Sequence, residues 1–423
     1  MHSWNRPQVP RVPGTGPVPT LFDTATGSLV SAPGTPTATL YVCGITPYDA
    51  THLGHAATYL AFDTLVRTWL DADIPVVYAQ NTTDVDDPLL ERATATGVDW
   101  RELAASQTDL FRGDMAALSI IPPDHFVAVT EMVDEIADAV AELVSRGFAY
   151  EVPASDSLGA VPDLYFDSAA ADADTAWSWG AESRLDRETM LTLSAERGGD
   201  PDRAGKRDRL DPLLWRAARE GEPQWSTALG AGRPGWHIEC SVIATRHLGD
   251  TITVQGGGSD LVFPHHEFSA AHATALSGAT FARIFSHAGM VGFDGEKMSK
   301  SLGNLVLVSR LTAAGVDARA IRLALLDHHY RADAEWTDDV LARGTGRLDR
   351  WREWASTADA TTASEPDDLV TDDLVAGIRA ALADDLDTPA ALRAVDSAVD
   401  SGAPATRMSV TAIHALLGVD LTA

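Results

Sequence analysis

The sequence predicts an α/β fold in which a parallel sheet is interrupted by an inserted segment and followed by a helical region. Strand patterns alternate with helix patterns at 39–84 and again at 236–289, as in a parallel sheet. A segment of short strands and polar loops separates these two halves. From about residue 306 the pattern is helical to the end, apart from a Thr/Asp/Glu-rich linker near 355–373.

The first half of the sheet is predicted from strand and turn signals in order. Residues 1–38 are rich in Pro, Gly and Thr and predict an irregular arm. The β-branched, alternating segment 39–44 predicts a strand. A helix pattern at 52–72 and a strand pattern at 75–84 complete a strand–helix–strand unit. Helices are expected within 87–119.

The middle of the chain interrupts this pattern and then returns to it. The segment 130–147 has an amphipathic helix pattern that ends at Gly147. The sheet then resumes with helices at 236–249 and 264–278 and strands at 251–256 and 282–289. We predict two halves of a parallel-sheet domain at 1–119 and 236–305, an inserted domain at 120–235 and a C-terminal helical domain at 306–423.

The composition limits which partners the protein can bind and where in the cell it is expected. The chain has 423 residues and a net charge of −29, a poor starting point for binding a large polyanion. Its apolar runs are too short to span a bilayer, and its N-terminus lacks the apolar core of a signal peptide. We therefore expect a cytoplasmic protein without a membrane partner, and a monomer. A disulfide between its two cysteines is not expected there.

Lysine is scarce, yet two lysines lie close together. The chain contains three lysines, and Lys297 and Lys300 belong to the single stretch "DGEKMSKSLGN" at 294–304. Two ammonium groups on a short loop can neutralise the charge that develops as pyrophosphate leaves ATP. A solvated surface turn is the alternative interpretation.

The stretch "THLGHA" at 51–56 lies where a loop gives way to a predicted helix. A helix start offers free N–H groups and a positive dipole end, which suit phosphate. His52 and His55 could donate hydrogen bonds to a triphosphate. By itself this spacing also fits a helix cap or a metal pair.

Together, "HLGH" and "KMSKS" resemble the two signatures of class I aminoacyl-tRNA synthetases. Within that class, "LYVCGITPYDATHLGHA", "QNTTDVDD", "GRPGWHIECS" and "GGGSDLVFPHHE" are most similar to cysteinyl-tRNA synthetase blocks, over residues 38–305. The resemblance implies a Rossmann-like class I synthetase catalytic domain with an inserted domain. It also implies activation of an amino acid by ATP, with Mg²⁺, to an aminoacyl-adenylate. His52, His55, Lys297 and Lys300 would then be catalytic.

The resemblance further implies one zinc ion held by Cys43, Cys240 and His265. Their spacing alone does not announce a metal site. In the synthetase a glutamate four residues after the histidine completes the shell, and here that position is Ser269. We expect a three-residue site whose remaining position takes water or the thiolate of L-cysteine. Zinc prefers thiolate to a neutral hydroxyl, so such a site would reject serine.

Three features argue against tRNA as the acceptor of the activated cysteine: the negative charge, the short region after the lysine loop, and "ERGGDP" at 196–201. With Ser269, these features are similar to a group of actinobacterial relatives of the synthetase that join cysteine to the amine of glucosaminyl-inositol. We therefore expect L-cysteine, ATP and glucosaminyl-inositol as substrates. A cysteinyl-tRNA synthetase and a non-catalytic zinc- or nucleotide-binding relative are the alternatives.

Further residues carry over from the resemblance less directly. Thr58 is expected near the substrate amine or carboxylate, or on the helix surface, and Trp236 against the cysteine pocket or in the core. Asp84, Asp86 and Asp87 suit helix capping or sugar contacts. The remaining expected substrate and adenylate contacts are Cys43, Gly44, Ile45, Thr46, Asn81, Thr82, Thr83, Gly258, Ser259, Asp260 and Val291.

Overall fold

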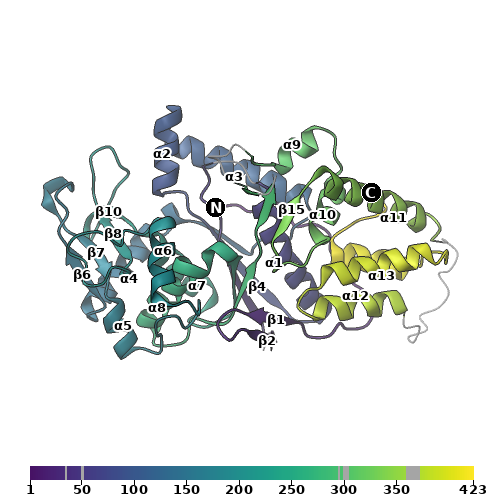
Figure 1. The fold of residues 1–423 in the computed structure, drawn as a ribbon, viewed down its shortest axis with the longest axis horizontal. Coiled ribbons are helices and arrows are strands. Elements are labelled where there is room, and N and C mark those ends of the chain that lie inside the picture. Colours follow the sequence, from purple (N-terminus) through teal and green to yellow (C-terminus); the bar gives the residue numbers. More distant parts are fainter. Residues whose placement is uncertain (34–35, 49–51, 294–295, 299–303, 359–371) are drawn as a thin grey trace.

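A computed structural model of the chain describes residues 1–423 except 34–35, 49–51, 294–295, 299–303 and 359–371. Figure 1 shows an elongated molecule in which the central parallel sheet lies between two further parts. A second sheet lies at one end and the C-terminal helices, coloured green to yellow, lie at the other.

The central sheet confirms the α/β prediction. Its strand order is β12-β11-β3-β4-β5, and every neighbouring pair is parallel. Because parallel neighbours need crossover connections, helices link its strands and cover its faces. The strands are β3 (Ala38–Val42), β4 (Val76–Thr82), β5 (His125–Ala128), β11 (Ile252–Gly258) and β12 (Ala282–Ala288). The connecting helices are α1 (Leu53–Asp71), α2 (Asp87–Thr96), α3 (Trp100–Ala117), α7 (Trp236–Leu248) and α8 (Glu267–Ser277).

Alternation along β3 decides which face of the sheet carries the site. Leu40 and Val42 belong to the core that contains α1, whereas Tyr41 and Cys43 belong to the core that contains α7 and α8. Successive side chains of a strand point to opposite faces, so Cys43 is directed toward α7.

The second sheet lies within the predicted insertion and is antiparallel, in the order β6-β7-β8-β10-β9. However, β5 and β4 pair in the central sheet, so the segment predicted as inserted at 120–235 begins with a central strand. The strands are β6 (Ala149–Val152), β7 (Asp163–Phe166), β8 (Leu213–Ala217), β9 (Trp225–Thr227) and β10 (Gly230–Pro234). The helices of this region are α4 (Val133–Ser145), α5 (Ser168–Asp174) and α6 (Arg187–Glu196).

Two local predictions are wrong. The arm at 1–38 is not irregular throughout, because β1 (Thr20–Asp23) and β2 (Ser28–Ser31) form a hairpin. Asp23 ties that hairpin to the sheet by accepting a hydrogen bond from the Phe285 amide. The region after 306 is not wholly helical, since β15 (Ala334–Trp336) pairs in parallel with β13 (Val291–Phe293). Strands β13 and β15 are three residues long each and lie about 40 residues apart in the sequence, so local patterning does not predict their pairing.

The C-terminal region packs its helices around α1. Because α1 meets the sheet on one side and these helices on the other, 14 of its 19 residues are buried. No helix among the described residues is long and apolar enough to cross a membrane. The C-terminal helices are α9 (Val308–Ala313), α10 (Ala318–Leu326), α11 (Asp338–Ala355), α12 (Asp373–Ala383), α13 (Thr388–Asp400) and α14 (Arg407–Ala412).

Candidate active site and metal centre

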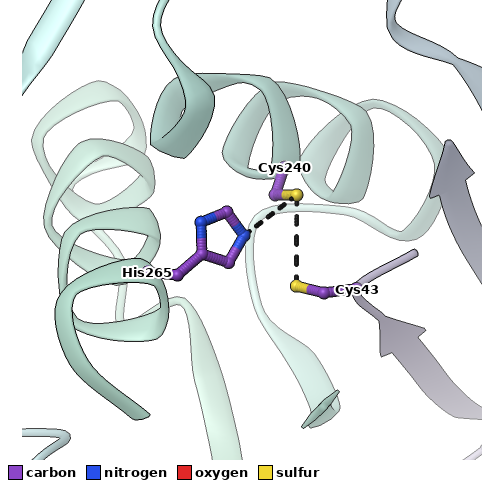
Figure 2. Close-up of side chains that lie close together, drawn as sticks. All are labelled: Cys43, Cys240 and His265. Carbon is purple, nitrogen blue, oxygen red and sulfur yellow. Dashed lines mark hydrogen bonds between the residues drawn. The ribbon is translucent and has the colours of Figure 1, made fainter. Parts of the chain in front are cut away.

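Three potential metal ligands meet at the carboxyl edge of the central sheet (Figure 2). Cys43 follows β3, Cys240 lies on α7, and His265 lies on a π-helical turn (Val262–His266) that leads into α8. All three side chains are buried, and their ligand atoms lie within 4.8 Å of one another. The Cys43 and Cys240 sulfurs are 4.0 Å apart, and Nε2 of His265 is 3.2 Å from the Cys240 sulfur.

This donor set fits zinc. Zn–S bonds of about 2.3 Å place two tetrahedral sulfur ligands about 3.8 Å apart, close to the separation found here. Among the described residues, the cluster contains no fourth Cys, His, Asp or Glu ligand. Ser269, at the position where the resemblance expected glutamate, is buried and its hydroxyl lies 3.3 Å from the backbone oxygen of His237, to which it donates. Three protein ligands with an open position are typical of catalytic zinc sites.

Neighbouring side chains orient these ligands. Nδ1 of His265 lies 3.0 Å from Nδ1 of His237, so His265 can donate there while its Nε2 faces the sulfurs. The Cys43 sulfur lies 3.3 Å from Nε2 of both Gln255 and His266. Burial and the nearby His265 lower the pKa of His237 well below its ordinary value, so His237 is neutral and can accept. Such partners fix the ring orientation of ligating histidines.

The two thiols share their protons unequally. Burial raises the pKa of the Cys43 thiol well above its ordinary value, and the hydrogen bond to Cys240 adds to this. Burial acts in the same sense on Cys240, but the hydrogen bond from Cys43 and the imidazole of His265 outweigh it and lower its pKa well below the ordinary value. These opposite directions favour Cys240 over Cys43 as the first of the two thiols to lose its proton, and a divalent cation bound by both would displace both protons.

Trp236 and the first signature motif border this centre. The Trp236 ring stacks on His265 at 4.3 Å between centroids, and the indole is half-buried. His52 caps α1 by accepting a hydrogen bond from the Gly54 amide, and its ring stacks on His55 at 3.9 Å. The helix-cap alternative for His52 is thus realised, and its expected contact with phosphate stays a prediction.

The segment after the lysine loop anchors the first signature motif. The Leu53 amide donates to the carbonyl of Val306 at 2.9 Å, and His52 pairs with Leu307. Lys297 ends the two-residue strand β14 (Glu296–Lys297), where its backbone pairs with Gly292. The side chain of Lys297 and the whole of Lys300 lie outside the described residues, so their predicted roles stay predictions.

A close contact between the ends of β3 and β4 shapes the loop that follows Cys43. The Gly44 amide donates to Oδ1 of Asn81 at 2.8 Å, and Oδ1 also accepts from the Tyr41 hydroxyl. Nδ2 of the Asn81 side chain donates to the hydroxyl of Thr83. Asn81 is buried, and both the oxygen and the nitrogen of its side-chain amide are hydrogen-bonded, so it acts on the site by holding Gly44 in place.

Substitution of Gly44 with alanine is expected to distort this loop. A Cβ there would lie 1.6 Å from the backbone oxygen of Asn81, so the two strand ends must separate. We expect G44A to lose about 1–3 kcal/mol of stability, as in overpacked cores, and most of its cysteine-dependent ATP–pyrophosphate exchange. Urea midpoints and exchange rates measure both.

Gly113 offers the matched control. It lies on α3, and a Cβ there meets nothing within 4 Å. G113A should be neutral or more stable by up to about 1 kcal/mol, because alanine favours helix over glycine. Equal behaviour of the two variants would contradict the assigned contact.

The remaining predicted residues fall into two groups. Thr58, Ser259 and Asp260 are half-buried, and a Cβ on Gly258 would lie 2.7 Å from Oδ1 of Asp260 and 3.9 Å from the Thr58 hydroxyl, so Asp260 and Thr58 both approach Gly258. The other group has buried side chains: Ile45, Thr82, Thr83 and Val291. Thr46 is half-buried and its carbonyl accepts from the Tyr48 amide.

Sequence reasoning missed His237 and Gln255. His237 lies three residues before Cys240, a spacing that places both on one face of α7. That spacing was a usable signal. Gln255 had none, because its contact with Cys43 depends on the pairing of β11 with β3.

Solved structures that share this fold include two tRNA synthetase complexes. Mycobacterium tuberculosis methionyl-tRNA synthetase bound by methionyl-adenylate matches with a TM-score of 0.59 and 15% identity, over 90% of this chain and 88% of that chain. The ternary complex of Agrobacterium radiobacter K84 LeuRS with tRNA and LeuAMS matches with a TM-score of 0.58 and 14% identity, over 92% and 84%. The fold is therefore that of the class I tRNA synthetases.

Sequence comparison then places the chain within that class. Residues 31–345 match the family described as tRNA synthetases class I (C) catalytic domain. Relatives named L-cysteine:1D-myo-inositol 2-amino-2-deoxy-alpha-D-glucopyranoside ligase match over 100% of the chain. They include proteins of Clavibacter michiganensis subsp. michiganensis (63% identical, 99% of the relative covered) and Kineococcus radiotolerans (58%, 100%). The chain therefore belongs to the class I (C) tRNA synthetase family, together with these relatives.

Proposed function

We propose that the chain condenses L-cysteine with the amine of glucosaminyl-inositol, at the expense of ATP, as in mycothiol biosynthesis. The observation that carries this proposal is a buried site of two thiols and one imidazole, with no fourth protein ligand among the residues that the structure describes, in a chain 63% identical to a ligase named for this reaction. The products are cysteinyl-glucosaminyl-inositol, AMP and pyrophosphate.

The first half-reaction forms a cysteinyl-adenylate. The cysteine carboxylate attacks the α-phosphorus of ATP, and the bond to pyrophosphate breaks. His52 and His55, at the start of α1, contact the phosphates, and Lys297 and Lys300 neutralise the leaving pyrophosphate. Asp260, beside Gly258, accepts hydrogen bonds from the ribose. Mg²⁺ accompanies ATP.

Substrate choice is made by the metal centre. A zinc ion held by Cys43, Cys240 and His265 would bind the substrate thiolate and so discriminate against serine, whose hydroxyl is not ionised at neutral pH. Trp236 stacks on His265 and walls this pocket. Asn81 holds Gly44, and with it the loop that begins at Cys43.

In the second half-reaction the sugar amine attacks the adenylate carbonyl. The new C–N bond forms as the bond to AMP breaks, and the amine loses a proton. The enzyme contributes by holding the two reactants in line, because orientation supplies much of such a rate. We place this reaction in the cytoplasm, where ATP is available, and propose a monomer as the acting unit.

The acceptor is tested directly. Purified enzyme is given cysteine and ATP with either glucosaminyl-inositol or tRNA. Mass spectrometry should detect the cysteinyl amide of the sugar, and AMP release should rise with sugar concentration. ATP–pyrophosphate exchange without acceptor serves as the control for activation.

A cysteinyl-tRNA synthetase is the second candidate, favoured by the match to a tRNA synthetase catalytic domain. Charged tRNA without any sugar amide would establish it and refute the ligase. Absence of cysteine-dependent exchange in the wild type would refute both and favour a non-catalytic binding protein.

A further inference from the structure

Arg197, on the inserted segment, forms hydrogen bonds to the backbone of the loop that carries His265. Its Nη1 atom donates to the backbone oxygens of Asp260 and Phe263, at 2.6 Å each. This nitrogen has two N–H groups, so each hydrogen has one carbonyl acceptor. A single charged donor therefore fixes the separation and orientation of two peptide groups on one short loop.

The turn after α6 delivers Arg197 to this position. Arg197 caps the helix, and Gly198 follows with a φ of +83°, the left-handed conformation that glycine adopts at helix ends. At Gly199 a Cβ would lie 2.2 Å from the hydroxyl of Ser194, and its amide donates to the Ser194 carbonyl. The "ERGGDP" stretch thus needs both glycines to direct its arginine toward the sheet.

This loop connects the position expected for the adenylate ribose to the metal ligand His265. Asp260 lies beside Gly258 at the end of β11, where the adenylate ribose is expected. Phe263 lies two residues before His265, with Pro264 between them. The peptide of Phe263 has an extended φ of −144° and ψ of 137°, in contrast to the helical turns on either side. Its carbonyl consequently points out of the helix, where Arg197 meets it.

We propose that Arg197 is a positioning residue that couples the nucleotide site to the metal centre. By holding both carbonyls, it fixes Asp260 relative to His265, so that the adenylate ribose and the cysteine side chain are held in register. Arg197 contacts the backbone of this loop, and it affects ligand binding through the positions of Asp260 and His265. The inserted segment is thereby part of the active-site framework. This inference rests on the proposed function for the identity of the two ligands.

The variants are Arg197→Gln, which removes the charge and shortens the side chain, and Arg197→Lys, which keeps the charge but replaces the planar guanidinium with an ammonium group. Arg184→Gln is the matched control. Arg184 also extends from the inserted segment and donates at 2.7 Å to a backbone carbonyl of the catalytic half, that of Thr26, which is neither of the carbonyls that Arg197 contacts. Full-length proteins are loaded with one equivalent of zinc.

Three quantities are measured: zinc affinity by competition with a chromogenic chelator, ATP affinity by calorimetry, and the thermal midpoint. We expect R197Q to weaken zinc and ATP binding about 10-fold each, the lower range for loss of a partner that orients metal ligands. R197K should fall between R197Q and the wild type. R184Q should match the wild type in both affinities.

A merely structural role would lower the thermal midpoint and leave both affinities within twofold of the wild type, which would overturn the proposal. A change in only one affinity would also overturn it, because coupling requires both. If R197Q fails to fold, R197K decides by the same criteria. Neither affinity depends on catalysis, so failure of the acceptor assay would refute the proposed function and leave this test standing.

Discussion

Replacement of Cys240 with serine is expected to remove zinc and to lower kcat/KM for cysteine by more than about 100-fold, beyond the range for loss of an outer-shell partner. Cys240 lies 4.0 Å from the Cys43 sulfur and 3.2 Å from Nε2 of His265, and its pKa is lowered despite burial. Serine keeps the volume but stays protonated at neutral pH. Only one sulfur and one imidazole would then remain to bind the metal.

Elemental analysis and cysteine-dependent ATP–pyrophosphate exchange measure this effect. Thr245→Ser is the control, because Thr245 lies on the same helix and its hydroxyl bonds only the α7 carbonyls of Ser241 and Val242 among the described contacts. That variant should retain one zinc and full exchange. Stoichiometric zinc in C240S, with normal exchange, would show that the metal and substrate assignments are wrong.

Replacement of Asp63 with asparagine is expected to cost about 3–5 kcal/mol of stability, as when one partner of a buried ion pair is removed. Its carboxylate is fully buried on α1 and accepts from Arg67 at 2.8 Å, from Arg322 on α10, and from the Ile121 amide at 2.8 Å. Arg67 and Arg322 are about 1% exposed. An amide would leave both guanidinium groups buried without a counter-charge.

The pH dependence gives this prediction a sign. Burial acts to raise the pKa of Asp63, but Arg67 and Arg322 outweigh it, so the folded pKa is lowered. Its contribution is therefore present above the ordinary carboxyl pKa of about 3.9 and is lost as the pH falls through the lowered folded value. D63N should lack this part of the acid dependence.

The urea midpoints of D63N and of the control D109N are measured between pH 3 and 7, at pH values about one unit apart. Asp109 pairs with Arg112 on the exposed face of α3, and its side chain is 72% exposed. Loss of that pair should change stability by no more than about 0.5 kcal/mol. If D63N and D109N proved equally stable, the buried network would not hold α1 to the C-terminal region.

The elements with strong local periodicity were predicted nearly to their ends. The helix expected at 52–72 is α1 at Leu53–Asp71, and the helix expected at 236–249 is α7 at Trp236–Leu248. The β1–β2 hairpin escaped prediction because Pro and Gly dominate its surroundings and because its anchor, the Asp23–Phe285 bond, spans most of the chain. Local pattern has no access to such pairing.

The candidate site likewise contains residues that the sequence predicted and residues that only the structure revealed. Cys43, Cys240 and His265 came from resemblance of short blocks, and the described structure brings all three together. Their orienting partner His237 and the arginine behind the loop, Arg197, came only from the folded chain. Each makes a contact between segments that no shared periodicity connects.

By itself, the sequence determined the alternation of strands and helices, the two signature motifs and the pair of cysteines, since these depend on residue type and near-neighbour spacing. The tertiary structure alone decided whether the three expected ligands meet. It placed Ser269 against a backbone carbonyl and left the metal cluster with three donors among the described residues. Hydrophobic burial brings these segments together from distant parts of the chain, and the resulting distances, at the ångström scale, select the chemistry.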